Sequence, residues 1–325
     1  MRGIELAPDR PVDELVELGA AAEDAGFDTA FVASHYNNRD PFAALTRLAT
    51  ATTDVRLGPG VVNPYETHPV ALASRAATLQ ELSGGRAVFG IGAGDRSTLA
   101  NLGLERERPL ARVAESITVS RQLWAGERVD HDGTFAANDA GLNYGVEPPP
   151  VYVGAQGPGM LRLAARFGDG VLVNASHPRD VAWSAEQLAD GLADRPDERG
   201  ELEVAVSAVV SVAEDADAAR EAARPPVAYI AAGAPEAVLD RHGLDAELAG
   251  EIGAGIGAGA YGEAFAAVSE PMLDAFAVAG TPEAVAERFG ALLEHADSVV
   301  AGSPLGPEPD RAVELLSRAY DAVGQ

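Results

Sequence analysis

Short apolar runs alternate along the chain with longer amphipathic stretches. The apolar runs are expected to be buried strands, at residues 4–6, 29–33, 55–60, 87–92, 150–154, 170–174, 204–212 and 298–301. The amphipathic stretches are expected to be helices, at residues 13–25, 42–52, 70–82, 110–125, 159–167 and 179–192. Buried strands that alternate with helices indicate a parallel sheet. Eight strand signals in this order favour an α/β fold of the closed (β/α)8 type, a TIM barrel, over an open doubly wound sheet.

Two stretches interrupt this alternation. Residues 127–149 are rich in turn-forming residues, and residues 225–276 read as a long helical insertion with a Gly/Ala-rich segment at 253–259. That segment is either a hinge, a tightly packed helix turn or a flexible loop. Neither insertion has the features of an independent domain, so residues 1–325 are predicted to form one barrel domain, a length common for such barrels.

Missing residue types exclude several chemistries. The chain has no cysteine, which excludes disulfides, thiolate nucleophiles and iron–sulfur clusters. All of its 24 basic residues are arginine, which excludes a lysine Schiff base and a P-loop ATPase. No apolar run is long enough to span a membrane. The N-terminus lacks a signal region, so a cytoplasmic protein is expected.

The formal charge of −26 carries information about partners and habitat. Such a field repels nucleic acid and anionic membranes, so neither is expected as a partner. An acidic excess without lysine favours adaptation to a salt-rich cytoplasm, where the Debye length falls to ~3 Å at molar salt, over a merely acidic protein.

The carboxyl ends of the strands are where a barrel of this type carries its active site. Glu5 lies in the first apolar strand, where burial would raise its pKa and let it hold a proton near neutral pH. Asp95 follows the strand at 87–92 and could face the same cavity. Capping of the following helix is an equally good explanation for Asp95, whereas a carboxylate in a core strand needs a partner or a task.

Two glycine-rich loops also follow strands. Gly90-x-Gly92-x-Gly94 has the wrong spacing for a dinucleotide-binding fingerprint, and no acidic strand end follows it at the required distance. Gly154, Ala155, Gln156 and Gly157 lead directly into a helix, where free N–H groups could bind phosphate without lysine. The alternative for this loop is an ordinary tight turn.

The histidines give no sign of a metal site. None of the six pairs with another at metal-ligand spacing, so no metal is expected. His35, at the end of a strand, is the histidine best placed to touch a ligand, and a structural role explains it equally well. No Gly-x-Ser-x-Gly elbow occurs, so serine hydrolase chemistry has no support.

These strand-end segments resemble one family over nearly the whole chain: the coenzyme F420-dependent methylenetetrahydromethanopterin reductases, within the luciferase-like barrel superfamily. The matching stretches are residues 3–5, 35–38, 57–65, 79–87, 90–95, 152–158, 173–176, 229–233, 278–282 and 300–304. The resemblance implies a luciferase-like TIM barrel with insertions that binds reduced F420 and a tetrahydropterin one-carbon carrier. It also implies a homo-oligomer, either a dimer or a tetramer.

The resemblance implies roles for individual residues. Glu5 matches the family's strand-one glutamate and would protonate a nitrogen of the methylene-pterin, whose iminium form then accepts a hydride from F420. A non-proline cis peptide maps to Gly60-Val61. Asp95 would contact the substrate. The residues expected to hold the cofactor are His35, Gly60, Val61, Asn63, Gly154, Ala155, Gln156, Gly157, Asn174 and Ala175.

The sequence leaves the identity of the carrier and two alternative functions open. The acidic, lysine-free composition resembles proteins of salt-loving archaea thought to use folate-type carriers, so the carrier is either tetrahydromethanopterin or tetrahydrofolate. Another F420- or FMN-dependent enzyme of the superfamily is the main alternative function. A barrel that only binds a ligand is the second, although Glu5 and the strand-end loops argue against it.

Overall fold

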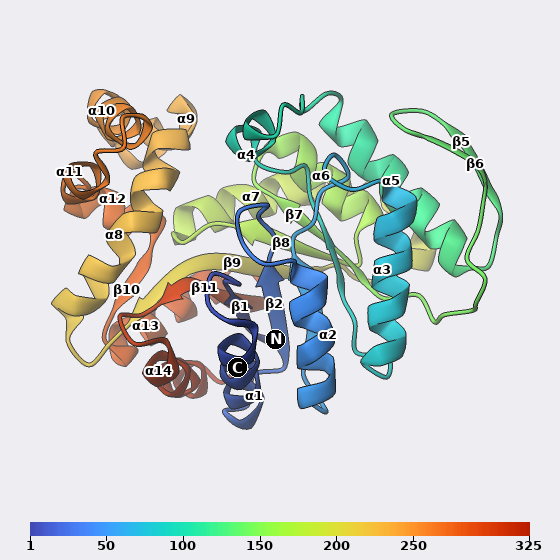
Figure 1. Cartoon of the computed structure of the whole chain (residues 1–325). Helices are drawn as coiled ribbons and strands as arrows, with labels where there is room; N and C mark the ends of the chain where they lie inside the picture. Colours follow the sequence, from blue (N-terminus) through green and yellow to red (C-terminus); the bar gives the residue numbers. More distant parts are fainter. The chain divides into compact units, whose positions relative to one another are not determined.

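The computed structural model describes residues 1–325, which group into two compact units (Figure 1). Unit 1 contains Gly3–Asn174 and Trp183–Ala205, together with Met1. Unit 2 contains Ala175–Ala182 and Val206–Gln325, together with Arg2. The single domain expected from the sequence stays a prediction.

Unit 1 is built on a parallel sheet. Its strands are β1 (Arg2–Leu6), β2 (Thr29–Ala33), β3 (Arg56–Gly60), β4 (Phe89–Ile91), β7 (Val151–Ala155) and β8 (Gly170–Asn174). They pair in parallel as β1–β2–β3 and as β4–β7–β8, and isolated bridges join β3 to β4. Because all six strands run the same way, their carboxyl ends share one edge. This edge carries most of the candidate site residues.

The helices of unit 1 follow its strands as the amphipathic pattern predicts. They are α1 (Val12–Asp24), α2 (Pro41–Ala51), α3 (Pro69–Leu82), α4 (Arg96–Asn101), α5 (Pro109–Trp124), α6 (Pro158–Phe167) and the 3-10 turn Asp197–Arg199, with α7 (Pro178–Leu192) built from residues of both units. Proline stands at the start of α2, α3, α5 and α6, where its fixed φ suits the helix and no N–H is needed.

The stretch 79–87, part of the family resemblance, has a structural role. The Arg86 guanidinium donates hydrogen bonds to the carbonyl oxygens of Ala49, Thr52 and Val55. It thereby ties the end of α2 to the start of β3. Gln80 contributes by accepting a hydrogen bond from the backbone N–H of Ala87. This stretch supports the sheet and places no side chain at its carboxyl edge.

The first insertion contains a hairpin that the turn-rich composition did not predict. The antiparallel strands β5 (Val129–Asp132) and β6 (Ala136–Ala140) form it. Glu115 of α5 holds the turn by accepting hydrogen bonds from the Thr134 N–H and hydroxyl. Alternating polar residues and alanine hid these strands, because the hairpin is a small two-stranded element outside the main sheet.

Unit 2 combines three parallel strands with helices. The strands are β9 (Glu203–Val212), whose first residues belong to unit 1, β10 (Val278–Gly280) and β11 (Ser298–Leu305). β9 has β10 and β11 as its neighbours. The short β10 was not expected from the sequence, and β11 extends beyond the predicted 298–301 to include a cis bond at Ser303-Pro304.

The second insertion begins earlier than predicted. The unit 2 helices are α8 (Ala216–Gly233), α9 (Glu236–His242), α10 (Ala246–Gly257), α11 (Tyr261–Ala266), α12 (Glu270–Phe276), α13 (Pro282–Leu293) and α14 (Pro309–Ala322). The expected boundary at Pro225 falls inside α8. Most of the Gly/Ala-rich segment 253–259 forms the last turns of α10, and the chain leaves the helix at Gly259, whose φ is positive.

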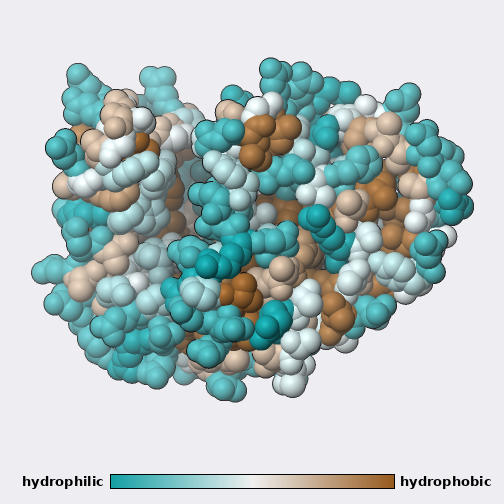
Figure 2. Space-filling model, in the orientation of Figure 1, coloured by the Kyte–Doolittle hydropathy of each residue, from teal (hydrophilic) through white to brown (hydrophobic).

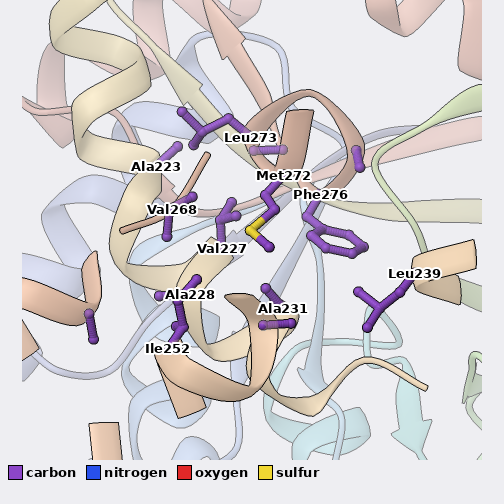
Figure 3. Close-up of a cluster of buried hydrophobic side chains, with 14 residues drawn as sticks. Ala223, Val227, Ala228, Ala231, Leu239, Ile252, Val268, Met272, Leu273 and Phe276 are labelled. Carbon is purple, nitrogen blue, oxygen red and sulfur yellow. The ribbon is translucent and has the colours of Figure 1, made fainter. Parts of the chain in front are cut away.

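The helices of the insertion have their own apolar core (Figure 3). Val227 and Ala231 of α8, Ile252 of α10 and Met272 and Phe276 of α12 are buried together in it. Small residues on α8 and α10 let these helices approach closely, since Gly253 has Ala232 as its near neighbour. The insertion is therefore a packed helical element.

The surface agrees with the acidic composition. In the view of Figure 2, hydrophilic residues cover most of the face and apolar residues form scattered patches. No helix combines the length and the apolar character needed to cross a membrane.

Candidate active site

Glu5 is the central group of the strand-end edge in unit 1. It lies in β1 opposite Phe31 of β2, and its carboxylate makes no hydrogen bond or ion pair. Burial raises the pKa of Glu5 to about 7, and no neighbouring charge contributes to the shift. A carboxyl group of this kind is half protonated at neutral pH and can give or take a proton.

Gly60 places the chain directly against this carboxyl group. A Cβ atom on Gly60 would lie 3.0 Å from Oε2 of Glu5 and 3.0 Å from Cβ of Phe31. The following peptide bond, Gly60-Val61, is cis, as the resemblance implies. The acid and the cis peptide are therefore neighbours at the ends of β1 and β3.

The side chain of Val61 fills the space that Cβ atoms would need at three glycines on or beside the neighbouring strands. Cβ atoms added to Gly92 and Gly154 would lie 2.8 Å and 2.9 Å from Cγ2 of Val61, and one added to Gly90 would lie 3.1 Å from its Cγ1. The Val61 side chain thus occupies space that these glycines leave open. Gly90 and Gly92 belong to a packing arrangement at β4, in keeping with the rejection of a dinucleotide fingerprint.

Asn63 is buried and its amide serves the local loop. Its Oδ1 accepts hydrogen bonds from the N–H groups of Tyr65 (3.1 Å) and Glu66 (3.0 Å), and its Nδ2 donates to the Glu66 carboxylate (2.7 Å). These bonds fix the loop that follows the cis peptide. Contact of Asn63 with a cofactor stays a prediction.

Asp95 caps helix α4, one of the two roles expected for it. Its Oδ1 accepts hydrogen bonds from the Thr98 N–H and hydroxyl and from the Ser97 hydroxyl. Burial alone would raise the pKa of Asp95, but these hydrogen bonds outweigh it and hold the pKa below its usual value. Thr98 also lies 3.4 Å from Nδ1 of the exposed His35. The loop after β2 therefore meets helix α4 at Thr98.

The second oxygen of Asp95 is available to a substrate, and this gives a test. In Asp95→Asn, Oδ1 can keep the cap while the charge is lost. We expect KM for the one-carbon carrier that the family resemblance implies to rise about tenfold, the effect of losing one charge-assisted hydrogen bond. The measurement is steady-state kinetics, with Asp95→Ser as a second variant that also keeps a cap. An unchanged KM in both variants would leave Asp95 as a helix cap only.

The loop after β7 has an open backbone. Gly157 precedes α6, a Cβ atom there would contact nothing within 4 Å, and Gln156 is exposed. Ala155 is buried and pairs with Val173 of β8. The expected cofactor-binding segment thus divides into residues held by packing, Gly154 and Ala155, and exposed residues, Gln156 and Gly157.

The last two predicted cofactor residues fall in different units. Asn174 is the exposed final residue of β8 in unit 1. Ala175 is a buried residue of unit 2, and its N–H donates to the carbonyl oxygen of Ser207. Next to it, the Ser176 hydroxyl accepts a hydrogen bond from the N–H of Val209. Ala175 and Ser176 are therefore fixed to β9.

The residues after Ser176 form a polar cluster that the sequence did not suggest. Asp180 binds Nη1 of Arg241 at 2.5 Å and Nε2 of His242 at 2.7 Å. The rings of His242 and His177 pack edge to face with centroids 4.9 Å apart. Burial, followed by the charge of Arg288, lowers the pKa of His177 to about 4. His177 is therefore neutral at physiological pH, and the cluster fastens α9 to the start of α7.

Two further residues of unit 1 reach the strand-end edge without having been predicted. The Arg106 guanidinium donates to the carbonyl oxygen of Gly94 at 2.9 Å, and the Tyr65 hydroxyl donates to the carbonyl oxygen of Glu107 at 2.6 Å. The charged run Glu105–Arg108 was the only sequence signal for Arg106. No group of three or more His, Cys, Asp or Glu side chains is arranged to hold a metal ion.

Comparison with known proteins identifies the family of this chain. Residues 2–297 match the model of the family described as luciferase-like monooxygenase. A 5,10-methylenetetrahydromethanopterin reductase of Archaeoglobus fulgidus is 43% identical over 97% of each chain. The chain belongs to the luciferase-like family. Within this family it groups with the methylenetetrahydromethanopterin reductases, since the enzyme of Methanolobus tindarius is also 40% identical over 97% of this chain and 98% of the relative.

A solved structure of the family establishes the fold class. The coenzyme F420-dependent tetrahydromethanopterin reductase of Methanopyrus kandleri matches with a TM-score of 0.89 and 37% identity, over 97% of this chain and 96% of that one. The luciferase-like (β/α)8 barrel expected from the alternation of strands and helices is thereby confirmed. The resemblance to this family that the strand-end segments indicated is confirmed as well.

Proposed function

We propose that this chain uses reduced coenzyme F420 to convert a 5,10-methylene-tetrahydropterin to its 5-methyl form. The observation that carries the proposal is the carboxyl group of Glu5. It is half-buried at the strand-end edge without a partner, with a pKa of about 7, and it adjoins the cis peptide Gly60-Val61. The names of the relatives from Archaeoglobus fulgidus and Methanopyrus kandleri support the same reaction.

Glu5 holds a proton for the substrate. In its protonated form the carboxyl group donates to the nitrogen of the carrier, which opens the methylene-bridged ring. When bound, reduced F420 supplies the hydride that completes the reduction. The chain itself needs no nucleophile, which agrees with the absence of cysteine and lysine.

Two features of the strand-end edge support the binding of a flat ring system. Gly60 carries no side chain beside the acid, and Val61 fills the space over Gly92 and Gly154, so the chain offers a smooth wall next to Glu5. His35 and the backbone of Asn63 border the same edge. In this proposal the exposed backbone of Gln156 and Gly157 binds the phosphate side of the cofactor, together with Asn174. Contact of Ala175 with the cofactor stays a prediction.

The test is an assay of F420 oxidation in molar salt. Reduced F420 is supplied with methylene-tetrahydromethanopterin or methylene-tetrahydrofolate, and formation of oxidised F420 is followed by absorbance. We expect turnover with at least one carrier, and the better carrier is the physiological class. Tight binding of FMN without binding of F420 would refute the proposal and favour an FMN-dependent enzyme.

The proposal includes the habitat, the location and the oligomeric state of the protein. We expect a salt-adapted, cytoplasmic homo-oligomer, either a dimer or a tetramer, that acts on a small-molecule carrier. Analytical ultracentrifugation across a salt series measures the oligomeric state. A monomer at every salt concentration would contradict this expectation without affecting the chemistry at Glu5.

A further inference from the structure

Arg106 has a donor that the protein leaves unused. Its Nη1 donates to the carbonyl oxygen of Gly94, but its Nε is buried and has no hydrogen-bond partner. The other buried side-chain atoms without a partner are the hydroxyls of Ser120 and Ser211, so Arg106 is the only basic residue in this state. Arg106 also forms no salt bridge, although the chain has 50 acidic residues.

Arg112, a nearby arginine, differs from Arg106 in the number of its bonds to the protein. Arg112 donates to the carbonyl oxygens of Pro64 (2.9 Å) and Thr134 (2.6 Å), and its guanidinium lies 4.7 Å from the centroid of the Tyr65 ring. Its bonds join the loop after β3 to the hairpin. Arg112 is thus a structural residue, whereas Arg106 has a single bond to the protein.

The position of Arg106 places it at the strand-end edge. Its one partner, Gly94, follows β4, and a Cβ atom on Gly94 would lie 3.1 Å from Cβ of Asn63 in the loop after β3. β4 pairs with β7, and β7 leads to the open loop at Gln156 and Gly157. Arg106 therefore borders the same edge as the acid and the candidate phosphate loop.

A guanidinium with free donors suits an anionic oxygen. Its planar fork matches carboxylate and phosphate groups, and such charge-assisted bonds are stronger than neutral ones. A buried donor without an acceptor is costly, so its retention needs an explanation such as a ligand. The net charge of −26 repels an acidic ligand at long range, so cations beside the site must compensate for this repulsion.

We propose that Arg106 is an anion-recognition residue of the strand-end site. Its unused donors bind a phosphate or carboxylate oxygen on the acidic side chain of the bound ligand. The inference rests on the proposed function, in which both ligands carry such groups. The oxygen belongs either to the phosphate- and carboxylate-bearing tail of F420 or to the acidic tail of the one-carbon carrier.

Arg106→Met tests this proposal, with Arg96→Met as the matched control. Arg96 is exposed on α4, so the control removes the same charge near the same edge. Fluorescence titration gives the Kd of F420 and of the deazaflavin nucleus that lacks the acidic tail, and kinetics give KM for the carrier. Loss of a charged hydrogen bond is expected to weaken binding by about tenfold or more.

The pattern of weakening identifies the source of the anion. A raised Kd for F420, with unchanged binding of the tail-less nucleus, places the tail of F420 on Arg106. A raised KM for the carrier, with unchanged F420 binding and kcat, places the carrier there. If both constants stay within twofold of those of Arg96→Met, Arg106 binds neither ligand and the proposal is overturned.

Two additions keep the test decisive. Arg106→Lys keeps the charge and loses the fork, so it is expected to weaken the same ligand to a smaller extent, and it replaces Arg106→Met if that variant does not fold. The proposed function fails on its own if the wild-type protein binds F420 but reduces neither carrier. The F420 titration then still decides the role of Arg106, and a wild type that does not bind F420 refutes both proposals.

Discussion

Replacement of Glu5 by glutamine is expected to lower kcat by ~10²–10⁴, the usual contribution of a general acid. Glutamine keeps the size of the side chain and has no proton to donate at neutral pH. The measurement is F420 oxidation with the carrier, and binding of F420 is expected to persist. Glu105→Gln, an exposed carboxylate between α4 and α5, serves as the control with the same charge change. Turnover of Glu5→Gln at the wild-type rate would show that another group supplies the proton.

The pH dependence gives this prediction a second readout. The proton donor is the neutral form of Glu5, whose pKa is about 7. The wild-type rate should therefore fall as pH rises through 7, approaching a tenfold loss per pH unit. The residual activity of Glu5→Gln should not show this loss. A wild-type rate that stays constant from about pH 6 to about pH 9 would exclude Glu5 as the acid.

Glu5→Gln should change stability and activity in opposite directions. The pKa of Glu5 is about 7 in the folded chain, against 4.5 for an ordinary, solvent-exposed glutamate. Below pH 4.5 both states are protonated, and as pH rises toward 7 the unfolded state loses its proton first, so the folded state loses stability. The full penalty above pH 7 is at most about 3 kcal/mol. Glu5→Gln removes it and should unfold at a higher temperature than wild type at pH 8.

Replacement of Gly90 by alanine is expected to have the largest effect on folding. A Cβ atom at this position would lie 1.9 Å from the carbonyl oxygen of Pro59, far inside contact distance. The obstacle is backbone of β3, so a side-chain rotation cannot relieve it. We expect a loss of at least about 3 kcal/mol in the free energy of unfolding, at the upper end of overpacking costs. Urea denaturation followed by circular dichroism measures this loss.

Gly145→Ala is the matched control for this experiment. A Cβ atom on Gly145 would contact nothing within 4 Å, so the same chemical change should leave the unfolding midpoint nearly unchanged. Equal midpoints for Gly90→Ala and Gly145→Ala would mean that β3 and β4 are less tightly packed than described. The comparison therefore tests the arrangement that seats Val61 beside the acid.

The strands that the sequence predicts well are those buried on both faces. β2 (Thr29–Ala33) and β8 (Gly170–Asn174) have the predicted bounds, because β-branched or aromatic runs flanked by polar residues or glycine mark such strands clearly. The hairpin of β5 and β6 was missed because its strands lack an apolar run. β10 was missed because only three residues pair with β9.

The candidate site was predictable only in part, for a physical reason. Glu5 stands out in the sequence because an ionisable residue in an apolar strand is costly. The fit of Val61 against Gly92 and Gly154 joins three strands, and the unused donor of Arg106 depends on atoms distant along the chain. Such features arise from packing, and local residue patterns contain no trace of them.

The cause of the Glu5 pKa has a consequence for the ionic environment. Salt screens interactions between charges, but the pKa of Glu5 is raised by burial alone, without a charged partner. Dissolved ions therefore have little to screen at this group. An acid tuned by a cation or a second carboxylate would drift as the medium becomes more concentrated. The proton affinity of Glu5 should therefore change less between dilute buffer and brine than that of an acid tuned by a neighbouring charge.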